Sequence, residues 1–314
     1  MVTKRIEWVD ITKGIAIFLM VCGHTSIPQS VSNWIWSFHM PLFFIMSGAL
    51  FNATKYPNFS CFLLKRVHTL VIPYIILSFV VLLINDNVLI VEWLYKGWNN
   101  GYALWFIPVL FFAEIYSYFI IHYGHGVKKV LFWAGIIGST GYLLSFYGIR
   151  FWYNVDVSFY ACFFYLIGYL LRNRLKQGLF CNWFLIFGIL FLNIVLSQIC
   201  PRTDMASNTC GWYGLNAFNA LLGTLAIIMI AKKDVLKKNN IVRTFFVWAG
   251  QNTLVILGLS QVVNVQLKFV MENMPMPEFI NFIIRHFSLW IILWLLSVII
   301  RKYLPEVIGQ KRDR

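Results

Sequence analysis

Charged residues are scarce in this sequence, and acidic residues are the scarcest among them. Only 12% of the 314 residues are charged and just 12 are Asp or Glu, whereas 60% are hydrophobic. Because a soluble domain carries about 25% charged residues, this composition excludes an ordinary water-soluble fold. The net charge of +14 is spread over short clusters between apolar runs, as in proteins that cross a membrane several times, so nucleic acid is not an expected partner.

Long polar stretches are missing as well. The segments between apolar runs reach at most about 18 residues, which is too short to bury a core of their own. The amino-terminal run carries Asp10 and Lys13 and has no Ala-x-Ala-like cleavage site, so we interpret it as a retained helix rather than a signal peptide. We therefore expect one membrane-embedded domain over residues 1–314, with no separate soluble domain.

The six cysteines show no spacing typical of a metal site, and no metal cofactor is expected. Cys200 and Cys210 border a predicted outer loop, 200–211, which would face an oxidising compartment. These two residues are interpreted either as a disulfide or as two free thiols.

Apolar runs recur along the whole chain. Because each is long enough to cross roughly 30 Å of hydrocarbon, they predict an all-α polytopic membrane protein with a bundle of about ten transmembrane helices. The runs lie near residues 8–27, 33–51, 67–84, 102–121, 130–148, 156–171, 180–199, 212–230, 242–263 and 281–300.

The distribution of Lys and Arg orients this bundle. With the amino terminus inside, five basic residues fall in predicted outer segments: Lys96, Arg150, Arg202, Lys268 and Arg285. Lys13 lies within the first run, and the remaining 20 of the 26 Lys and Arg residues fall on the inner side. Since cytoplasmic loops carry the excess of Lys and Arg, both termini are predicted to be cytoplasmic.

A polar seam follows one face of the first predicted helix. Lys13 and His24 are eleven residues apart, which places them within about 20° of the same face and about 16 Å apart along the axis. Asp10 lies about 40° from His24 by the same geometry. An ionisable group inside a membrane span is costly to keep, so His24 is the leading candidate for a functional residue.

His39 begins the second predicted span at a depth similar to that of His24. Two imidazoles at one level suit proton transfer or nucleophilic chemistry, because either can be neutral near pH 7. The alternative for each histidine is a purely structural hydrogen bond to a neighbouring carbonyl.

Four further polar residues are weaker candidates. Arg66 is either a cytoplasmic anchor or a ligand for a phosphate-bearing donor. Glu114 is a buried carboxylate of unknown role that must pair, for example with Lys13, or be protonated. Arg150 and Asp156 could bind a polar acceptor on the outer side, or form a surface ion pair.

In these residues the chain resembles the integral-membrane acyltransferase type 3 family, which O-acylates bacterial polysaccharides and related glycans. The resemblance covers nearly the whole chain and is carried mainly by residues 5–14, 23–24 and 38–48. Weaker matches are Arg66 with Pro73-Tyr74, residues 104–106 and residues 163–169.

The resemblance assigns roles to several residues. His24 matches the family's essential histidine, and Lys13 stands where many members carry Arg. Arg66 matches the first Arg of a paired motif, whereas Thr69 stands where the second Arg is usual. Similarly, Ser260 lies near the place where many members have a histidine.

We therefore expect a multi-pass O-acyltransferase of the bacterial cytoplasmic (inner) membrane. It would use acetyl-CoA or another acyl-CoA as co-substrate, with Lys13, Arg66 and Asp10 at the donor site and His24 and His39 as catalytic groups. The acceptor would be a surface glycan or its lipid-linked precursor, with membrane lipid around the protein and a homo-oligomer left open. The alternative is a transporter or flippase in which His24 relays protons.

Overall fold

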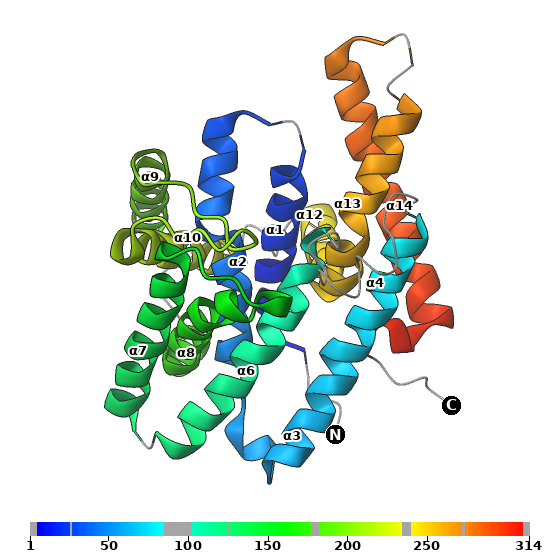
Figure 1. Cartoon of the computed structure of the whole chain (residues 1–314). Helices are drawn as coiled ribbons and strands as arrows, with labels where there is room; N and C mark the ends of the chain where they lie inside the picture. The colour runs from blue at the N-terminus through cyan, green and yellow to red at the C-terminus, as the bar shows by residue number, and fades with distance from the viewer. Residues whose placement is uncertain are drawn as a thin grey trace. The chain divides into compact units, whose positions relative to one another are not determined.

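The computed structural model describes residues 5–25, 27–84, 102–124, 126–177, 182–233, 240–271, 274 and 276–309. Within these ranges the ordered elements are helices, which confirms the all-α fold class (Figure 1). Several basic residues and one cysteine lie outside the described ranges: Lys4, Lys96, Cys181, Lys237, Lys238, Lys311, Arg312 and Arg314.

The longer helices are α1 (Glu7–Gly23), α2 (Gln29–Leu50), α3 (Phe59–Arg66), α4 (Ile72–Ile84), α6 (Phe106–Tyr123), α7 (Val127–Phe146), α8 (Val155–Gln177), α9 (Trp183–Ile199), α10 (Tyr213–Ala231), α12 (Asn240–Gln251), α13 (Thr253–Met271) and α14 (Glu278–Tyr303). Short helical turns join some of them: η1 (Ala53–Lys55), η2 (Val67–Val71), η3 (Tyr102–Trp105), η4 (Trp152–Asn154) and η5 (Pro305–Ile308).

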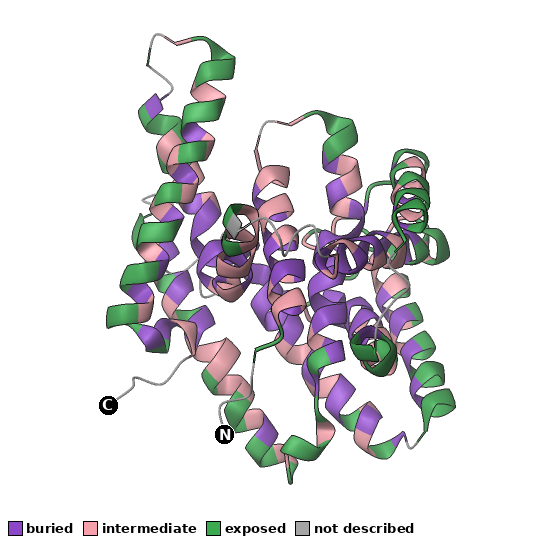
Figure 2. Cartoon of the chain, turned by 180° about the vertical axis from the view of Figure 1, so that it is seen from behind, coloured by how far each residue is buried: buried purple, intermediate pink, exposed green. Residues whose placement is uncertain are grey.

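Seven helices of the described chain are long and apolar enough to cross a membrane. Figure 2 shows many exposed residues along these helices, and large hydrophobic side chains are among them. α9, a shorter apolar helix, exposes Phe184 by 87% and Phe191 by 71%. Exposed apolar area on this scale needs lipid rather than water around it. The protein is therefore a multi-pass membrane protein, whereas the count of ten spans and the cytoplasmic termini stay predictions.

The predicted ninth span, 242–263, is wrong as a single helix. The structure divides it at Asn252 into α12 and α13. Gln251 donates from Nε2 to Oδ2 of Asp10 on α1 at 3.2 Å, so the end of α12 is held against α1. Side-chain hydrogen bonds of this kind are invisible in the apolar pattern that predicts the span.

The chain divides into two compact units, residues 1–57 with 109–251 and residues 58–108 with 252–314. In the first unit α2 packs against α1, α8, α9 and α10, while α1 also packs against α10 and α12, and α7 packs against α8. Figure 1 shows α1 and α2 side by side within this unit. The prediction of one domain over residues 1–314 stays a prediction.

Two helix crossings of the first unit depend on reciprocal glycines. A Cβ on Gly48 of α2 would lie 1.8 Å from the Tyr165 carbonyl oxygen, and one on Gly168 of α8 would lie 2.0 Å from that of Ile45. The same exchange joins α1 and α12, since a Cβ on Gly250 would lie 1.8 Å from the Asp10 carbonyl oxygen. Small residues allow backbones to approach this closely in membranes.

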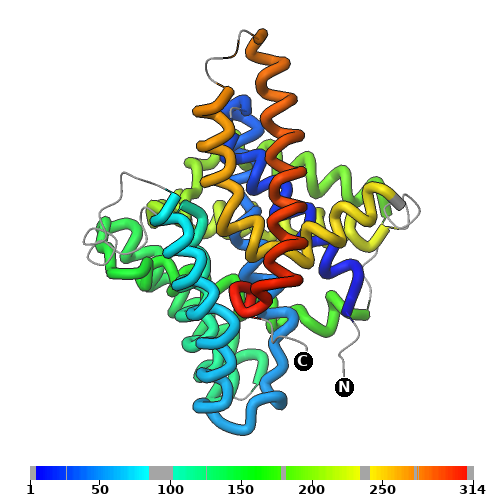
Figure 3. Tube along the Cα trace, turned by 90° about the vertical axis from the view of Figure 1, so that its right-hand side faces the viewer, coloured from blue at the N-terminus to red at the C-terminus, as the bar shows by residue number. Residues whose placement is uncertain are grey.

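The second unit contains α3, α4, α13 and α14. α13 and α14 pack together as an antiparallel pair, visible as the gold and orange-red helices of Figure 3. Between α3 and α4 lies a π-helical turn, Val67–Val71, just before Pro73. A proline inside a helix has no N–H and crowds the carbonyl four residues earlier, and widening the turn relieves that conflict.

Candidate active site

His24 lies at the carboxyl-terminal cap of α1 rather than inside a helix. Its backbone N–H contacts the carbonyl oxygens of Met20 at 3.3 Å and Val21 at 3.2 Å, and α1 ends at Gly23. The predicted run 8–27 therefore extends four residues beyond the end of α1. The loop after α1 ends at Pro28, the residue before α2. Because a proline disfavours helical backbone at the residue that precedes it, α1 has to end before Pro28.

His39 is buried within α2 and has a defined tautomer. Its Nδ1 lies 2.9 Å from the carbonyl oxygen of Ile35. Since a carbonyl oxygen can only accept, Nδ1 must carry the proton and Nε2 keeps the lone pair. The structural hydrogen bond considered for this histidine is thus present, and it leaves the other ring nitrogen available for chemistry.

Trp36 lies between the two histidines. Its ring centroid is 5.2 Å from that of His24 and 5.4 Å from that of His39, with both pairs in edge-to-face contact. The guanidinium carbon of Arg202 lies over the indole at 4.3 Å from the ring centroid. The predicted proximity of the two imidazoles is therefore present, with an indole between them.

Two charges from the loop after α9 reach this pair of rings. Arg202 and Asp204 both interact electrostatically with His24, and Arg202 also with His39. The Asp204 carboxylate accepts from the Ala206 backbone N–H at 3.0 Å and from Ser207 Oγ at 2.9 Å. These bonds hold the Asp204 carboxylate in place. Its interaction with His24 is electrostatic.

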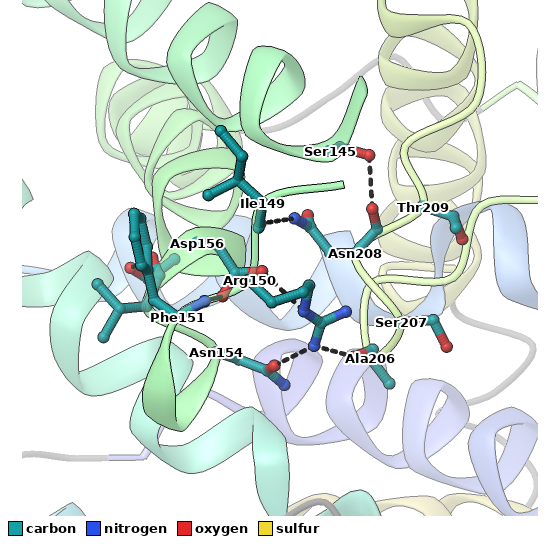
Figure 4. Close-up of polar contacts among 12 residues, drawn as sticks. Ser145, Ile149, Arg150, Phe151, Asn154, Asp156, Ala206, Ser207, Asn208 and Thr209 are labelled. Atoms are coloured by element: carbon teal, nitrogen blue, oxygen red, sulfur yellow. Dashed lines mark hydrogen bonds and ion pairs between the residues drawn. The ribbon is translucent and has the colours of Figure 1, made fainter. Parts of the chain in front are cut away.

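The loop that carries Arg202 is held in one conformation by hydrogen bonds. Ser145 at the end of α7 donates from Oγ to the Asn208 carbonyl oxygen at 2.5 Å, and the same Oγ accepts from the Cys210 backbone N–H at 3.1 Å. Asp204 and Thr209 exchange backbone hydrogen bonds of 2.9 and 2.8 Å across the turn. The loop is thereby tied to the α7–α8 connection, as Figure 4 shows.

Arg150 and Asp156 belong to this tie. Arg150 Nε lies 3.2 Å from Asp156 Oδ2, and its Nη2 donates to Asn154 Oδ1 at 2.5 Å and to the Ala206 carbonyl oxygen at 3.1 Å (Figure 4). Asp156 also accepts from the Phe151 backbone N–H at 2.9 Å. The ion-pair alternative is thus what the structure contains, and acceptor binding by these residues stays a prediction.

Cys200 and Cys210 are free thiols, so the disulfide alternative is wrong in this structure. Burial raises the pKa of the Cys210 thiol to about 11. Cys210 is 2% exposed and anchored through its backbone to Ser145, so the hydrogen bonds of Figure 4, rather than a covalent bridge, hold the loop closed.

The other two candidates on α1 lie toward its beginning. Lys13 is half-buried, one helical turn after Asp10. No ion pair between them is present among the described residues, and the Asp10 carboxylate accepts a hydrogen bond from Gln251 of α12. Close by, Arg243 of α12 pairs with Glu7 through two hydrogen bonds of 2.8 and 2.6 Å.

Arg66 ends α3 in the second unit. Its guanidinium carbon lies 5.5 Å from the centroid of the Phe62 ring, and the π-helical turn begins at the next residue. Thr69 donates its hydroxyl to the Lys65 carbonyl oxygen at 2.9 Å, so this side chain serves the local backbone. A π-helical turn often marks a functional position, and this one coincides with the Arg66 motif of the family resemblance.

Glu114 is buried on α6, with 4% exposure. One turn later, Ser117 Oγ lies 3.2 Å from Cys162 Sγ of α8, and Tyr116 stacks on Phe159 at 5.1 Å between ring centroids. Glu114 therefore lies on the helix that packs against α8, and its role stays open.

Sequence reasoning missed Trp36, Arg202 and Asp204. Trp36 is one of 13 tryptophans, and its position three residues before His39 could have singled it out, since residues three apart share a helix face. In the sequence Arg202 is only an outer-loop charge, and Asp204 has no motif around it. Their approach to His24 depends on a loop about 180 residues later in the chain.

Similarity to known proteins agrees with these observations. The profile of the acyltransferase domain family matches residues 6–301, which is essentially the whole chain. No curated protein and no solved structure gives a significant match. The matched region includes the histidine pair and the Arg66 motif, and it ends within α14. The chain therefore belongs to the acyltransferase type 3 family of membrane acyltransferases.

Proposed function

We propose that this membrane acyltransferase moves an acyl group, most simply acetyl, from cytoplasmic acyl-CoA to a hydroxyl of a cell-surface glycan or its lipid-linked precursor. The observation that carries the proposal is the pair His24 and His39 on either side of Trp36. Family membership supports the class of reaction.

His24 is the group to which we assign the chemistry. As a general base, His24 takes the proton of the acceptor hydroxyl while the oxygen attacks the thioester carbon. As a nucleophile, it carries the acyl group until the hydroxyl attacks. In both routes the C–S bond breaks. In the base route the imidazole passes the hydroxyl proton on to the CoA thiolate; in the nucleophilic route the acylated imidazole loses its own N–H proton to the thiolate, and the hydroxyl proton returns to the imidazole when the acyl group leaves it.

We assign the donor site to α1, on which Lys13 lies. A cation at Lys13 lies about 16 Å from His24 along the helix axis. Acyl-CoA carries its phosphates at one end and its thioester at the far end of a long, thin arm, so phosphates near Lys13 would let the thioester reach His24. Arg66, after which the π-helical turn begins, stays a donor ligand only as the family resemblance implies, and Asp10 is assigned to positioning the donor near Lys13.

We assign the acceptor site to the loop that carries Arg202. This loop brings an exposed guanidinium to the histidine pair, and a guanidinium offers five hydrogen-bond donors to hydroxyl or carboxyl oxygens of a sugar. With the predicted orientation, the loop would face outward from the bacterial cytoplasmic membrane, where a lipid-linked or surface glycan is available.

The test measures transfer of label from [14C]acetyl-CoA to glycan in membranes that contain the wild-type protein or a variant. His24→Ala is expected to abolish transfer while the protein stays inserted and folded. His122→Ala is the control, because His122 is a histidine near the end of α6 whose Nδ1 bonds the Tyr118 carbonyl oxygen of its own helix at 2.9 Å and to which no role in transfer is assigned. Full transfer by His24→Ala would refute the mechanism.

A further inference from the structure

The indole N–H of Trp36 is a buried donor. Its Nε1 is shielded from solvent, and among the described residues it has no hydrogen-bond partner. A buried N–H without an acceptor costs free energy and is uncommon in folded proteins. At the wall of a reaction site, such a donor indicates that a bound molecule supplies the acceptor.

A second tryptophan of α2 shows what a satisfied indole looks like in this protein. Trp34, two residues earlier, donates from Nε1 to Asn193 Oδ1 of α9 at 2.7 Å. Asn193 in turn donates to the Asn219 carbonyl oxygen of α10 at 3.0 Å. Asn193 of α9 therefore satisfies one indole, whereas the other, beside His24, has no acceptor among the described residues.

Nε1 of Trp36 lies close to Gly23, the residue directly before His24. The closest atoms to a Cβ built on Gly23 are Cγ2 of Ile35 at 3.3 Å and Nε1 of Trp36 at 3.4 Å. Because Gly23 has no side chain, no Cβ stands between its backbone and the Trp36 N–H. The two rings meet edge to face at an interplanar angle of 75°.

Arg202 strengthens the same donor. Its guanidinium carbon lies 4.3 Å from the Trp36 ring centroid, where a cation attracts the π electrons of the ring. This contact withdraws electron density from the indole and makes its N–H a better donor. Arg202 also holds the ring in place, so it is a positioning residue.

We propose that the Trp36 indole N–H donates a hydrogen bond to the carbonyl oxygen of the acyl group during transfer. The acceptor oxygen, or the His24 nitrogen, bonds to the carbonyl carbon. The C=O electron pair then moves onto the carbonyl oxygen. The N–H stabilises the resulting negative charge until the carbonyl re-forms and the C–S bond breaks. This role rests on the acyl transfer proposed above and adds the donor that such a step requires.

The experiment removes the N–H, and one of its two variants keeps the shape of the bicyclic ring. Trp36 is replaced by benzothienylalanine, an isostere with sulfur in place of N–H, and in parallel by Phe. Both are expected to lower kcat about 100-fold with little change in KM, since the lost bond forms chiefly in the transition state. Trp34→Phe is the matched control and should lower the melting temperature while leaving kcat close to the wild-type value.

The two proposals can fail separately. If the benzothienylalanine protein keeps a wild-type kcat while His24→Ala is inactive, acyl transfer stands and the role of Trp36 is refuted. If the wild-type protein transfers no acetyl group, the proposed function itself fails. Should Trp36→Phe not fold, the isosteric analogue alone decides, because it preserves the packing of the ring.

Discussion

Gly168→Ala adds one methyl group at the crossing of α2 and α8. A Cβ at this position would lie 2.0 Å from the backbone oxygen of Ile45, whereas real Cβ atoms essentially never approach closer than 3.0 Å. Because the obstacle is backbone, no rotamer change relieves it, and α8 must move away from α2 by about 1 Å. The reciprocal contact of Gly48 with Tyr165 would open at the same time.

The expected cost follows from this displacement. Overpacking a tightly packed site costs about 1–3 kcal/mol, and a clash with backbone belongs at the upper end, about 3 kcal/mol. Alanine recovers about 1 kcal/mol of helix propensity relative to glycine. The net loss in the free energy of unfolding is then about 2 kcal/mol.

Gly188→Ala on α9 is the matched control. Gly188 is also a helical glycine, and nothing lies within 4 Å of a Cβ built on it. This variant should gain up to about 1 kcal/mol from propensity alone, so the two variants should differ by about 3 kcal/mol. Thermal unfolding in detergent, with acetyl transfer measured beside it, provides the comparison.

The transfer assay reports whether the crossing positions the site. His39 and Trp36 both lie on α2, six and nine residues before Ile45, so moving α8 should disturb their geometry and lower activity. Equal melting temperatures for Gly168→Ala and Gly188→Ala would refute the reasoning, because they would show that the two helices do not approach as closely as the structure has them.

Two further predictions concern the loop that carries Arg202. Arg150→Gln leaves the fully buried Asp156 carboxylate without its cation, which should cost about 2 kcal/mol, less than for a fully buried pair because Arg150 is partly exposed; an unchanged melting temperature would contradict this. Cys210, with its pKa raised to about 11 by burial, should react slowly with iodoacetamide at pH 8 and faster as the pH approaches 11, because the thiolate is the reactive form. The exposed Cys61 should already react at pH 8, and equal rates for the two thiols would show that the loop is open.

Apolar run length and residue spacing predicted much of this protein. Hydrophobic runs predicted an all-helical membrane protein because in lipid every backbone polar group must be satisfied within its own segment. The residues around His24 and His39 were enough to indicate the family. Run length alone, however, merged α12 with α13, since it cannot register a polar break such as Gln251-Asn252 within an apolar stretch.

For the polar residues, too, the structure decided what the sequence left open. Asn219 of α10 accepts from Asn193 of α9 through its backbone oxygen. Gln251 of α12 donates to Asp10 of α1. Each partner lies on another helix that is distant in sequence, so the sequence does not reveal these bonds.

The sequence by itself determined the solvent of this chain, its helical class and its family, and it made His24 a candidate, because these depend on composition and on spacing within single segments. Only the tertiary structure decided that Trp36 separates the two imidazoles and that Arg202 and Asp204 reach them from a distant loop. It also decided that Arg150 binds Asp156. Each of these depends on how separate helices and loops pack, and packing brings together residues whose distance along the chain carries no information about their contact.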